Sequence, residues 1–305
     1  MEFKEITLQD KEWIRQLLGY SDNRATEFNF TVLYIWRDIM RSRVCRVGDY
    51  LVVRFFPNGA PAPMYLFPQG RGTAEELKGV LESCMEDARQ NGHPFLMASV
   101  QNGHKEILEN LFPDRFTFEP NRDYFDYIYS AEDLTFLRGK KFQSKRNFVS
   151  RFKRQEGWSY EPLGKDNLKE CAAMSISWCA KYGCGKDPSM ASESCSVKNA
   201  LHNFEQLGLM GGLLRLNGEV VAFTIAEKTN SDTLLVHIEK AYGDIVGAYP
   251  AIANEFLRNS IVEEGELLSV KYINREDDAG DLGLREAKMQ YHPLFLLEKY
   301  SVKEK

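Results

Sequence analysis

Two polar residues close a predicted strand in the second half of the chain. The run TLLVHIE (233–239) has the composition of a strand and places His237 and Glu239 two residues apart, hence on the same side. Glu239 stands at the carboxyl end, where open α/β sheets bind ligands. A carboxylate there is a candidate general base; a salt bridge with Lys240 or Lys288 is the alternative. The pair offers too few ligands for a metal ion, so no metal site is expected.

A second polar group follows the next predicted strand, ELLSVKYI (266–273). Asn274 and Glu276 begin at its carboxyl end, which is again the ligand-binding edge. A carboxylate at this edge can take a proton from an amine or hydroxyl, and an amide can hold a carbonyl group. Asn274, Glu276 and Glu239 are therefore candidate catalytic groups. The alternative is a surface charge network that only anchors the next helix.

A predicted helix follows directly and carries two neighbouring cations. Asp281 is a candidate N-cap residue, and Arg285 and Lys288 lie three residues apart on one helix face. An arginine–lysine pair beside carboxylates suits a phosphate-bearing donor and a cationic acceptor. Arg285 joins the candidate catalytic groups, with the role of holding the donor carbonyl or a phosphate.

The segment 137–157 is strongly basic. It has no acidic residue before Glu156 and carries Arg138, Lys140, Lys141, Lys145, Arg146, Arg151, Lys153 and Arg154. Phe148 and Phe152 lie four residues apart and are predicted to point into the core. The cations could neutralise phosphates of a nucleic acid. A solvated linker helix whose lysine stems cover apolar surface is the alternative.

Local patterns predict the elements that position these residues. Two β-rich runs (44–56) predict a hairpin. A strand at 64–67 then leads through a glycine turn into a helix that begins with the T-x-x-E capping box of Thr73 and Glu76. A strand at 94–100 follows. This order is a βαβ unit and predicts parallel pairing of its two strands.

The same order recurs near the C-terminus. Asn217-Gly218 is a strong hairpin signal between two β-rich runs. The strand 233–239 leads through a glycine turn into a helix with Pro250 in its first turn, and the strand 266–273 closes a second βαβ unit.

This repeat predicts two related α/β domains in tandem, each an α+β arrangement with a mixed sheet. The boundary is expected inside or just after the basic segment, which gives domains of residues 1–150 and 151–305. One large mixed sheet is the alternative.

Composition excludes several classes of protein. The chain has 305 residues, 43% hydrophobic and 27% charged, which is globular composition. The net charge of −5 argues against a globally basic nucleic-acid binder. The sequence shows no transmembrane run and no apolar signal segment, so a cytoplasmic protein is expected. The six cysteines form no C-x-x-C pair and are expected as thiols of a reducing compartment.

Three stretches resemble the C-terminal domain of bacterial aminoacyl-phosphatidylglycerol (lysylphosphatidylglycerol) synthases and its uncharacterised soluble relatives. They lie across residues 125–293 and read FDYIYSAEDL running into GKKFQSKRN, HIEKA with GAYPAIANEF, and YINREDDAGDLGLREAKMQYHP. The resemblance implies two tandem acyltransferase (GNAT-like) folds, an architecture that the peptidoglycan Fem-type aminoacyltransferases share.

The resemblance also implies an activity. An aminoacyl group would pass from aminoacyl-tRNA to an amine or hydroxyl acceptor by direct attack, with Glu239 or Glu276 as the general base. No further cofactor is then required, tRNA is the expected partner, and the acceptor is a small molecule, a peptide or a lipid headgroup. The matching stretches supply the candidate substrate-binding residues His237, Tyr249, Asp281, Lys288, Lys140, Lys141, Lys145, Arg146 and Asn147.

Two further hypotheses stay open. Acyl-CoA-dependent GNAT enzymes hold pyrophosphate on a turn of pattern Q/R-x-x-G-x-G/A. The stretch from Asp244 to Tyr249 opposes this pattern, whereas Gln69, Arg71 and Gly72 fit it and are candidate cofactor-binding residues; a plain helix-entry turn is the alternative. An acyl-CoA-dependent N-acyltransferase is thus the second hypothesis. The third is a non-catalytic tRNA- or metabolite-binding module on a degenerate GNAT fold.

Overall fold

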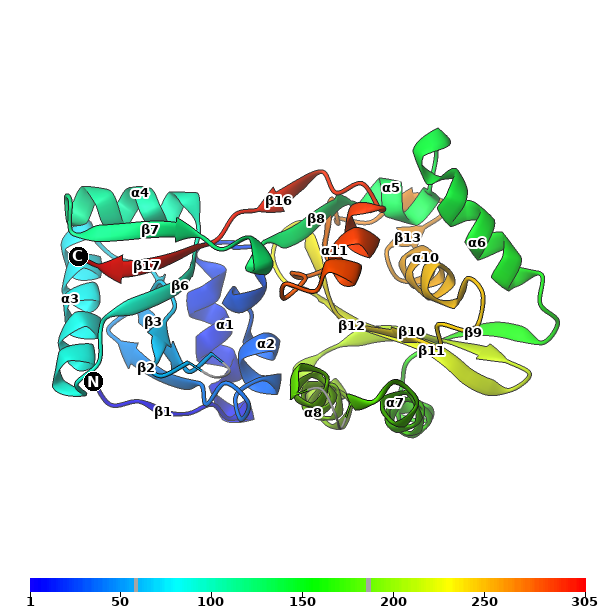
Figure 1. The fold of residues 1–305 in the computed structure, drawn as a ribbon, viewed down its shortest axis with the longest axis horizontal. Coiled ribbons are helices and arrows are strands. Elements are labelled where there is room, and N and C mark those ends of the chain that lie inside the picture. Colours follow the sequence, from blue (N-terminus) through cyan, green and yellow to red (C-terminus); the bar gives the residue numbers. More distant parts are fainter. Residues whose placement is uncertain (58–59, 185–187) are drawn as a thin grey trace. The chain divides into compact units, whose positions relative to one another are not determined.

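Two compact units make up the computed structural model, which describes residues 1–57, 60–184 and 188–305. Each unit has its own mixed sheet (Figure 1), which confirms the predicted fold class. Unit 1 comprises Met1–Asp126, Asp277–Leu282 and Leu296–Lys305, and unit 2 comprises Tyr127–Glu276 and Gly283–Phe295. The chain thus enters unit 2 well before the predicted boundary near residue 150, because the segment between pairs and packs with unit 2.

Unit 1 has the strand order β1-β2-β3-β4-β6-β17-β7, with β5 paired to β3. Its strands are β1 Lys4–Glu5, β2 Arg43–Val47, β3 Tyr50–Phe55, β4 Met64–Tyr65, β5 Gln69–Gly70, β6 Leu96–Val100, β7 Phe116–Pro120 and β17 Tyr300–Glu304. Its helices are η1 Leu8–Asp10, α1 Lys11–Gly19, η2 Thr26–Phe28, α2 Phe30–Ile35, α3 Ala74–Gln90, α4 Asn102–Leu111 and η3 Arg122–Tyr124.

Local sequence chemistry accounts for the elements predicted in unit 1. The hairpin β2–β3 is antiparallel, and β4 pairs with β6 in parallel, as predicted. The capping box at the start of α3 is also present: Thr73 Oγ1 accepts from the Glu76 amide, and Glu76 Oε2 accepts from the Thr73 amide. Two of the amide groups that a helix start leaves without a partner are thereby satisfied.

Unit 2 has the strand order β16-β8-β15-β12-β11-β10-β9 and a separate hairpin β13-β14. Its strands are β8 Asp126–Ser130, β9 Trp158–Pro162, β10 Met210–Leu216, β11 Glu219–Lys228, β12 Thr233–Ala241, β13 Val262–Glu263, β14 Glu266–Leu267, β15 Tyr272–Asn274 and β16 Phe295–Leu297. Its helices are α5 Ala131–Phe136, η4 Lys140–Phe142, α6 Gln143–Lys153, α7 Leu168–Tyr182, α8 Pro188–His202, α9 Phe204–Leu207, α10 Ala248–Ser260 and α11 Leu282–Met289.

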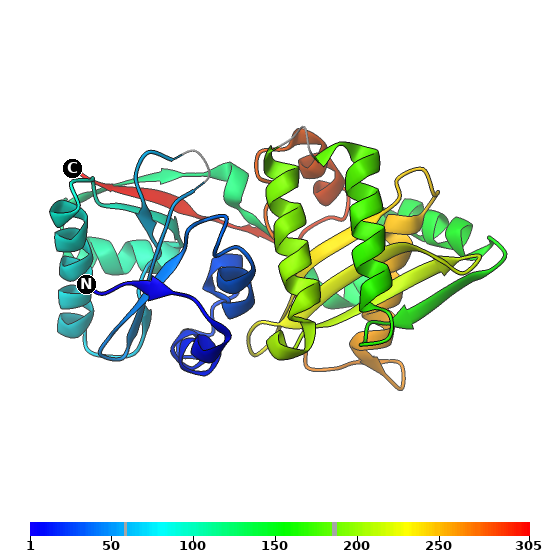
Figure 2. The same cartoon turned by 90° about the horizontal axis from the view of Figure 1, so that it is seen from below.

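Helices cover both faces of the second sheet. The predicted hairpin at Asn217-Gly218 is β10–β11, and β12 and β15 pair in parallel, as predicted. Helix α10 lies on one face of β10–β12, and α7 and α8 lie on the other (Figures 1 and 2). This arrangement leaves the carboxyl ends of β12 and β15 next to α10.

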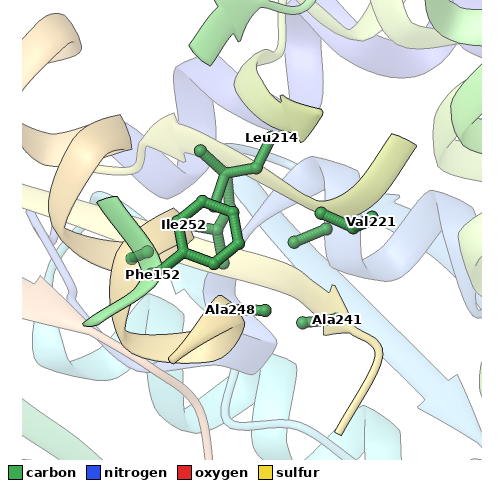
Figure 3. Packing of buried hydrophobic residues seen from close by; sticks show 8 residues of the cluster. Phe152, Leu214, Val221, Ala241, Ala248 and Ile252 are labelled. Carbon is green, nitrogen blue, oxygen red and sulfur yellow. The ribbon is translucent and has the colours of Figure 1, made fainter. Parts of the chain in front are cut away.

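A cluster of buried apolar residues holds α10 against the strands. Phe152 of α6 is fully buried with Leu214 and Ile252 (Figure 3). Phe148 was also predicted in the core, but it is 38% exposed. The helix backbone explains the difference: a Cβ on Gly247 would lie only 2.2 Å from the Phe148 carbonyl oxygen, so α6 contacts α10 through its backbone there.

The two sheets each contain a strand from a distant part of the chain. After β7 the chain leaves unit 1 and adds β8 to the second sheet, beside β15. The C-terminal strand β17 then lies between β6 and β7 in the first sheet. Lys299, just before β17, has its Nζ 2.7 Å from Asp126 Oδ1, where the chain leaves, and 2.7 Å from Glu27 Oε2. The side chains of Lys299 and Asp126 are 1% and 0% exposed.

The cysteines correct one expectation. Cys179 and Cys184 form a disulfide, because α7 ends at the left-handed Gly183 (φ +81°) and the chain reversal brings the two Cα atoms within 5.0 Å. Cys171 is a free, buried thiol and Cys195 a free, exposed one, as predicted. Among the residues that the structure describes, no helix is both long and apolar enough to cross a membrane.

Candidate active site

The pairing of β12 with β15 stops well before β12 ends. The two strands pair only from Thr233 to Leu235, whereas β12 continues to Ala241. Beyond the last pair, Arg275 Nη2 donates to Glu239 Oε1 at 2.6 Å, and both side chains are largely buried. The cavity beside this ion pair has about 20 Å³ of room for the centres of water-sized molecules, which is enough for roughly one water. Little free space therefore remains beside Glu239 and Arg275.

An irregularity in β12 gives His237 a separate set of partners. Ile238 pairs with Ile225 of β11, but Val236 pairs with Ala226, so His237 is an extra residue in the ladder. Such bulges interrupt the alternation of side chains along a strand. Glu239 consequently meets Arg275, while His237 meets two other carboxylates.

The imidazole of His237 bridges Glu227 and Glu276. Its Nε2 lies 3.0 Å from Glu227 Oε1, and its Nδ1 lies 3.3 Å from Glu276 Oε1. The side chains of Glu227 and His237 are buried, at 6% and 1% exposure, whereas that of Glu276 is 24% exposed. Burial alone would lower the pKa of His237, but hydrogen bonds with both carboxylates raise it to about 9.

We expect the stability of unit 2 to depend on pH through His237. Its pKa rises from an ordinary 6.5 to about 9 on folding, so the contribution is complete below about pH 6.5 and disappears as the pH rises through 9. The free energy of unfolding should fall by up to about 3 kcal/mol over this range. Denaturant unfolding followed by Trp158 and Trp178 fluorescence between pH 6 and 9.5 measures the change. His237→Gln should remove it; equal slopes in both proteins would contradict the assignment.

The backbone around Glu276 is held from several directions. Glu276 has φ +57°, the left-handed region that residues with a Cβ seldom adopt. Its amide donates to Oδ1 of the fully buried Asn274 at 2.7 Å, and its carbonyl accepts from the Tyr127 amide at 3.1 Å. Lys288 Nζ donates to the Arg275 carbonyl at 2.7 Å. Strain of this kind persists where the surrounding structure imposes it, which is common at functional sites.

Aromatic rings and a second cation surround Arg275. The Arg275 guanidinium carbon lies 4.8 Å from the Tyr291 ring centroid, and Lys145 Nζ lies 4.1 Å from the same centroid. Burial raises the pKa of Tyr291 to about 12. Burial, and then the charge of Arg275, lower the pKa of Lys145. Lys145 also donates to Gln290 Oε1 at 3.2 Å.

The remaining basic candidates lie on η4, α6 and α11. Lys140 and Asn147 are exposed, and Lys141 Nζ forms an ion pair with Asp133 at 2.7 Å. Arg146 donates to the carbonyls of Leu137 and Gly139, so it braces the turn before η4. Arg285 is half-buried on α11.

The two other candidates are Asp281 and Tyr249. Asp281 belongs to unit 1, where its amide donates to the Asp278 carbonyl at 2.8 Å. Tyr249 lies in the first turn of α10, close enough to Glu239 that burial, and then that charge, raise its pKa to about 12. The roles of all these candidate residues in substrate binding stay predictions.

The glycine turn of unit 1 has internal partners for its polar groups. The Gln69 side chain donates to the Phe67 and Pro68 carbonyls, and Arg71 Nε lies 3.5 Å from Asp49 Oδ2. A Cβ on Gly72 would come within 2.7 Å of Glu76 Oε2. Asp49 and Glu76 thus already contact this turn, and the acyl-CoA site stays a prediction.

Sequence reasoning missed two residues of this region. Glu227 lies one residue before the end of β11 and pairs with Leu235, so no sequence signal linked it to His237. Arg275 lies inside the matching stretch, but the sequence pattern favoured Arg285. In the structure, Arg275 has the closest contact to Glu239.

Solved structures resemble the chain over its full length. A conserved protein of unknown function from Bacteroides thetaiotaomicron VPI-5482 is 39% identical, with a TM-score of 0.91 and coverage of 100% of both chains. The C-terminal domain of a putative lysylphosphatidylglycerol synthetase from Agrobacterium fabrum is 14% identical, with a TM-score of 0.66 over 97% of this chain and 92% of that one. A tandem GNAT protein from the clavulanic acid biosynthesis pathway is 10% identical, with a TM-score of 0.52 over 99% and 98%. These likenesses confirm the tandem GNAT-like fold.

Sequence comparisons identify the family. An uncharacterised protein of Mycoplasmoides gallisepticum is 24% identical over 183 residues, which are 58% of this chain and 56% of that protein. The chain thus spans about half the length of this curated relative. The sequence model of the acyltransferase family described as "Phosphatidylglycerol lysyltransferase, C-terminal" matches residues 20–303. With nearly the whole chain matched, the protein belongs to the phosphatidylglycerol lysyltransferase C-terminal family.

Proposed function

We propose that the protein moves an aminoacyl group from aminoacyl-tRNA to an amine or hydroxyl acceptor. The observation that carries this proposal is the position of Glu276 just beyond the carboxyl end of β15. Its carboxylate is partly exposed and contacts the buried His237. The family description supports it, because lysyl transfer is aminoacyl transfer. Glu239 is the weaker candidate base, since its carboxylate is engaged by Arg275.

In the proposed reaction the acceptor attacks the ester carbonyl directly. Glu276 takes the proton from the attacking nitrogen or oxygen as the new amide or ester bond forms. The bond to the ribose 3′ oxygen then breaks, and the same proton returns to that oxygen, so no net proton is gained or lost. Asn274 holds the Glu276 backbone, and Arg285 is the candidate that stabilises the donor.

We infer that the donor tRNA contacts the basic segment of η4 and α6. Replacing Lys140 and Lys141 with glutamate should weaken tRNA binding, and the slope of log affinity against log salt should fall by about 1 for each phosphate that the variant no longer neutralises. Filter binding at several salt concentrations measures both quantities. Lys198→Glu, an exposed change on α8, is the control. Equal effects of the two charge reversals would contradict specific contact.

Two measurements test the proposed function. Thermal unfolding is followed with total tRNA or coenzyme A, since a ligand at 100 times its dissociation constant stabilises the folded state by about 2.7 kcal/mol. Radiolabelled aminoacyl-tRNAs are then incubated with amine and hydroxyl acceptors. Enzyme-dependent loss of label from tRNA into an acceptor supports the proposal. Turnover of acetyl-CoA with no tRNA reaction would replace it with the acyl-CoA hypothesis.

A non-catalytic binding module is the second candidate function. The observation that favours it is the small space between β12 and β15, where Glu239 and Arg275 leave about 20 Å³ of room. A tRNA-induced rise in unfolding temperature without any transfer would favour this module over the enzyme.

A further inference from the structure

Glu227 is a buried carboxylate one residue before the end of β11. It is 6% exposed, and its Oε1 lies 3.0 Å from Nε2 of His237. Burying an ionised carboxylate is costly unless a positive partner compensates it. His237 is such a partner and also contacts Glu276, so the buried Glu227 is linked to the partly exposed Glu276 through a single ring.

The partners of His237 define its protonation state. An ionised carboxylate can only accept hydrogen bonds, so each ring nitrogen that faces one must carry a proton. With Glu227 on Nε2 and Glu276 on Nδ1, both nitrogens donate and the ring is an imidazolium. An imidazolium cannot take up a further proton from the amine or hydroxyl that is acylated. The role of general base is therefore left to Glu276.

The backbone fixes the positions of His237 and Glu276. The bulge in β12 turns His237 away from the Glu239 side, and the left-handed Glu276 is held by Asn274 and Tyr127. In the part of the chain that the structure describes, Glu276 Oε2 has no hydrogen-bond partner, whereas Oε1 accepts from His237. One oxygen is therefore anchored while the other stays available.

We propose that Glu227 is a positioning residue: it keeps His237 doubly protonated, and the imidazolium in turn anchors Glu276 Oε1 so that Oε2 meets the acceptor. This inference rests on the proposed function only where it calls Glu276 the base. The chain of contacts itself can be tested without any substrate.

The first test is nitrogen-15 NMR of the histidine side chains, with His237 assigned from a His237→Gln variant. At pH 7.5 the wild-type ring should show two protonated nitrogens. Glu227→Gln should leave one, and the titration midpoint should fall by about one pH unit or more. Glu227→Asp should recover part of the shift. The exposed His292 serves as the internal control, because its titration should not change. An unchanged His237 midpoint in Glu227→Gln would overturn the inference, whatever the activity.

The second test is the transfer reaction. Glu227→Gln should lower kcat on the order of 10²-fold through misplacement of Glu276, with KM little changed. It should also shift the pH profile, which a loss of stability alone would not do. Full turnover in a variant whose ring has become neutral would overturn the positioning role. If the wild-type protein transferred no group from any donor, the proposed function would be wrong. The NMR result would then test the contacts of His237 by itself.

Discussion

Replacing Lys299 with methionine is expected to lower the free energy of unfolding of unit 1 by about 3–5 kcal/mol. Methionine keeps the apolar stem but removes the ammonium, whose Nζ lies 2.7 Å from both Asp126 and Glu27. Two carboxylates would then share a buried position without a compensating charge. Guanidinium unfolding followed by Trp13 and Trp36 fluorescence measures the loss, since both indoles belong to unit 1.

Two further variants control this experiment. Lys303→Met removes an exposed lysine from β17, the strand that follows Lys299, and should change the free energy of unfolding by no more than about 0.5 kcal/mol. Should Lys299→Met fail to fold, Asp126→Asn offers a milder change, which keeps the size of the side chain. If Lys299→Met lowers the free energy of unfolding by less than about 1 kcal/mol, the ion pairs of Lys299 with Asp126 and Glu27 do not stabilise unit 1.

Replacing Glu276 with glutamine is expected to reduce aminoacyl transfer by about 10²- to 10⁴-fold, the usual contribution of a positioned general base. The amide oxygen of glutamine can still accept from His237 Nδ1, so the side chain should keep its place while losing its basicity. The effect should therefore fall on kcat, with KM close to the wild-type value. Single-turnover measurements with labelled aminoacyl-tRNA separate the two.

The comparison variants distinguish the two carboxylates. Glu286→Gln on α11 is exposed and should leave transfer unchanged. Glu239→Gln should mainly reduce stability, because the buried Arg275 would lose its charged partner. If Glu276→Gln and Glu239→Gln both keep full turnover, neither carboxylate is the base.

Short-range sequence chemistry predicted much of the local structure. The capping box of Thr73 and Glu76 and the hairpin at Asn217-Gly218 are both present, because each depends on residues a few positions apart. Both βαβ units have the expected parallel pairs.

Long-range pairing was beyond such reasoning. Nothing local in Tyr300–Glu304 indicates that it pairs with Leu96–Val100 and Phe116–Pro120 at once. The predicted burial of Phe148 was wrong for a related reason, because the approach of α6 to Gly247 is a tertiary contact.

The candidate site was predictable in its location but not in its contacts. Its polar residues end strands, so the sheet edge follows from Glu239, Asn274 and Glu276 alone. Their partners depend on where the pairing of β12 with β15 stops and on one extra residue in β12. That is why Glu227 and Arg275 became visible only in the structure.

The position of β17 constrains how the chain can be synthesised and folded. Strands β6 and β7 leave the ribosome early, but β17, which pairs with both, follows only after unit 2 has been made. At 5–20 residues per second, their facing edges wait roughly 10 to 35 s for this strand during translation. Unpaired edges of this kind readily join other chains. Nascent chains should thus be vulnerable to aggregation until β17 has emerged, and a chaperone that shields the first sheet would act in this interval.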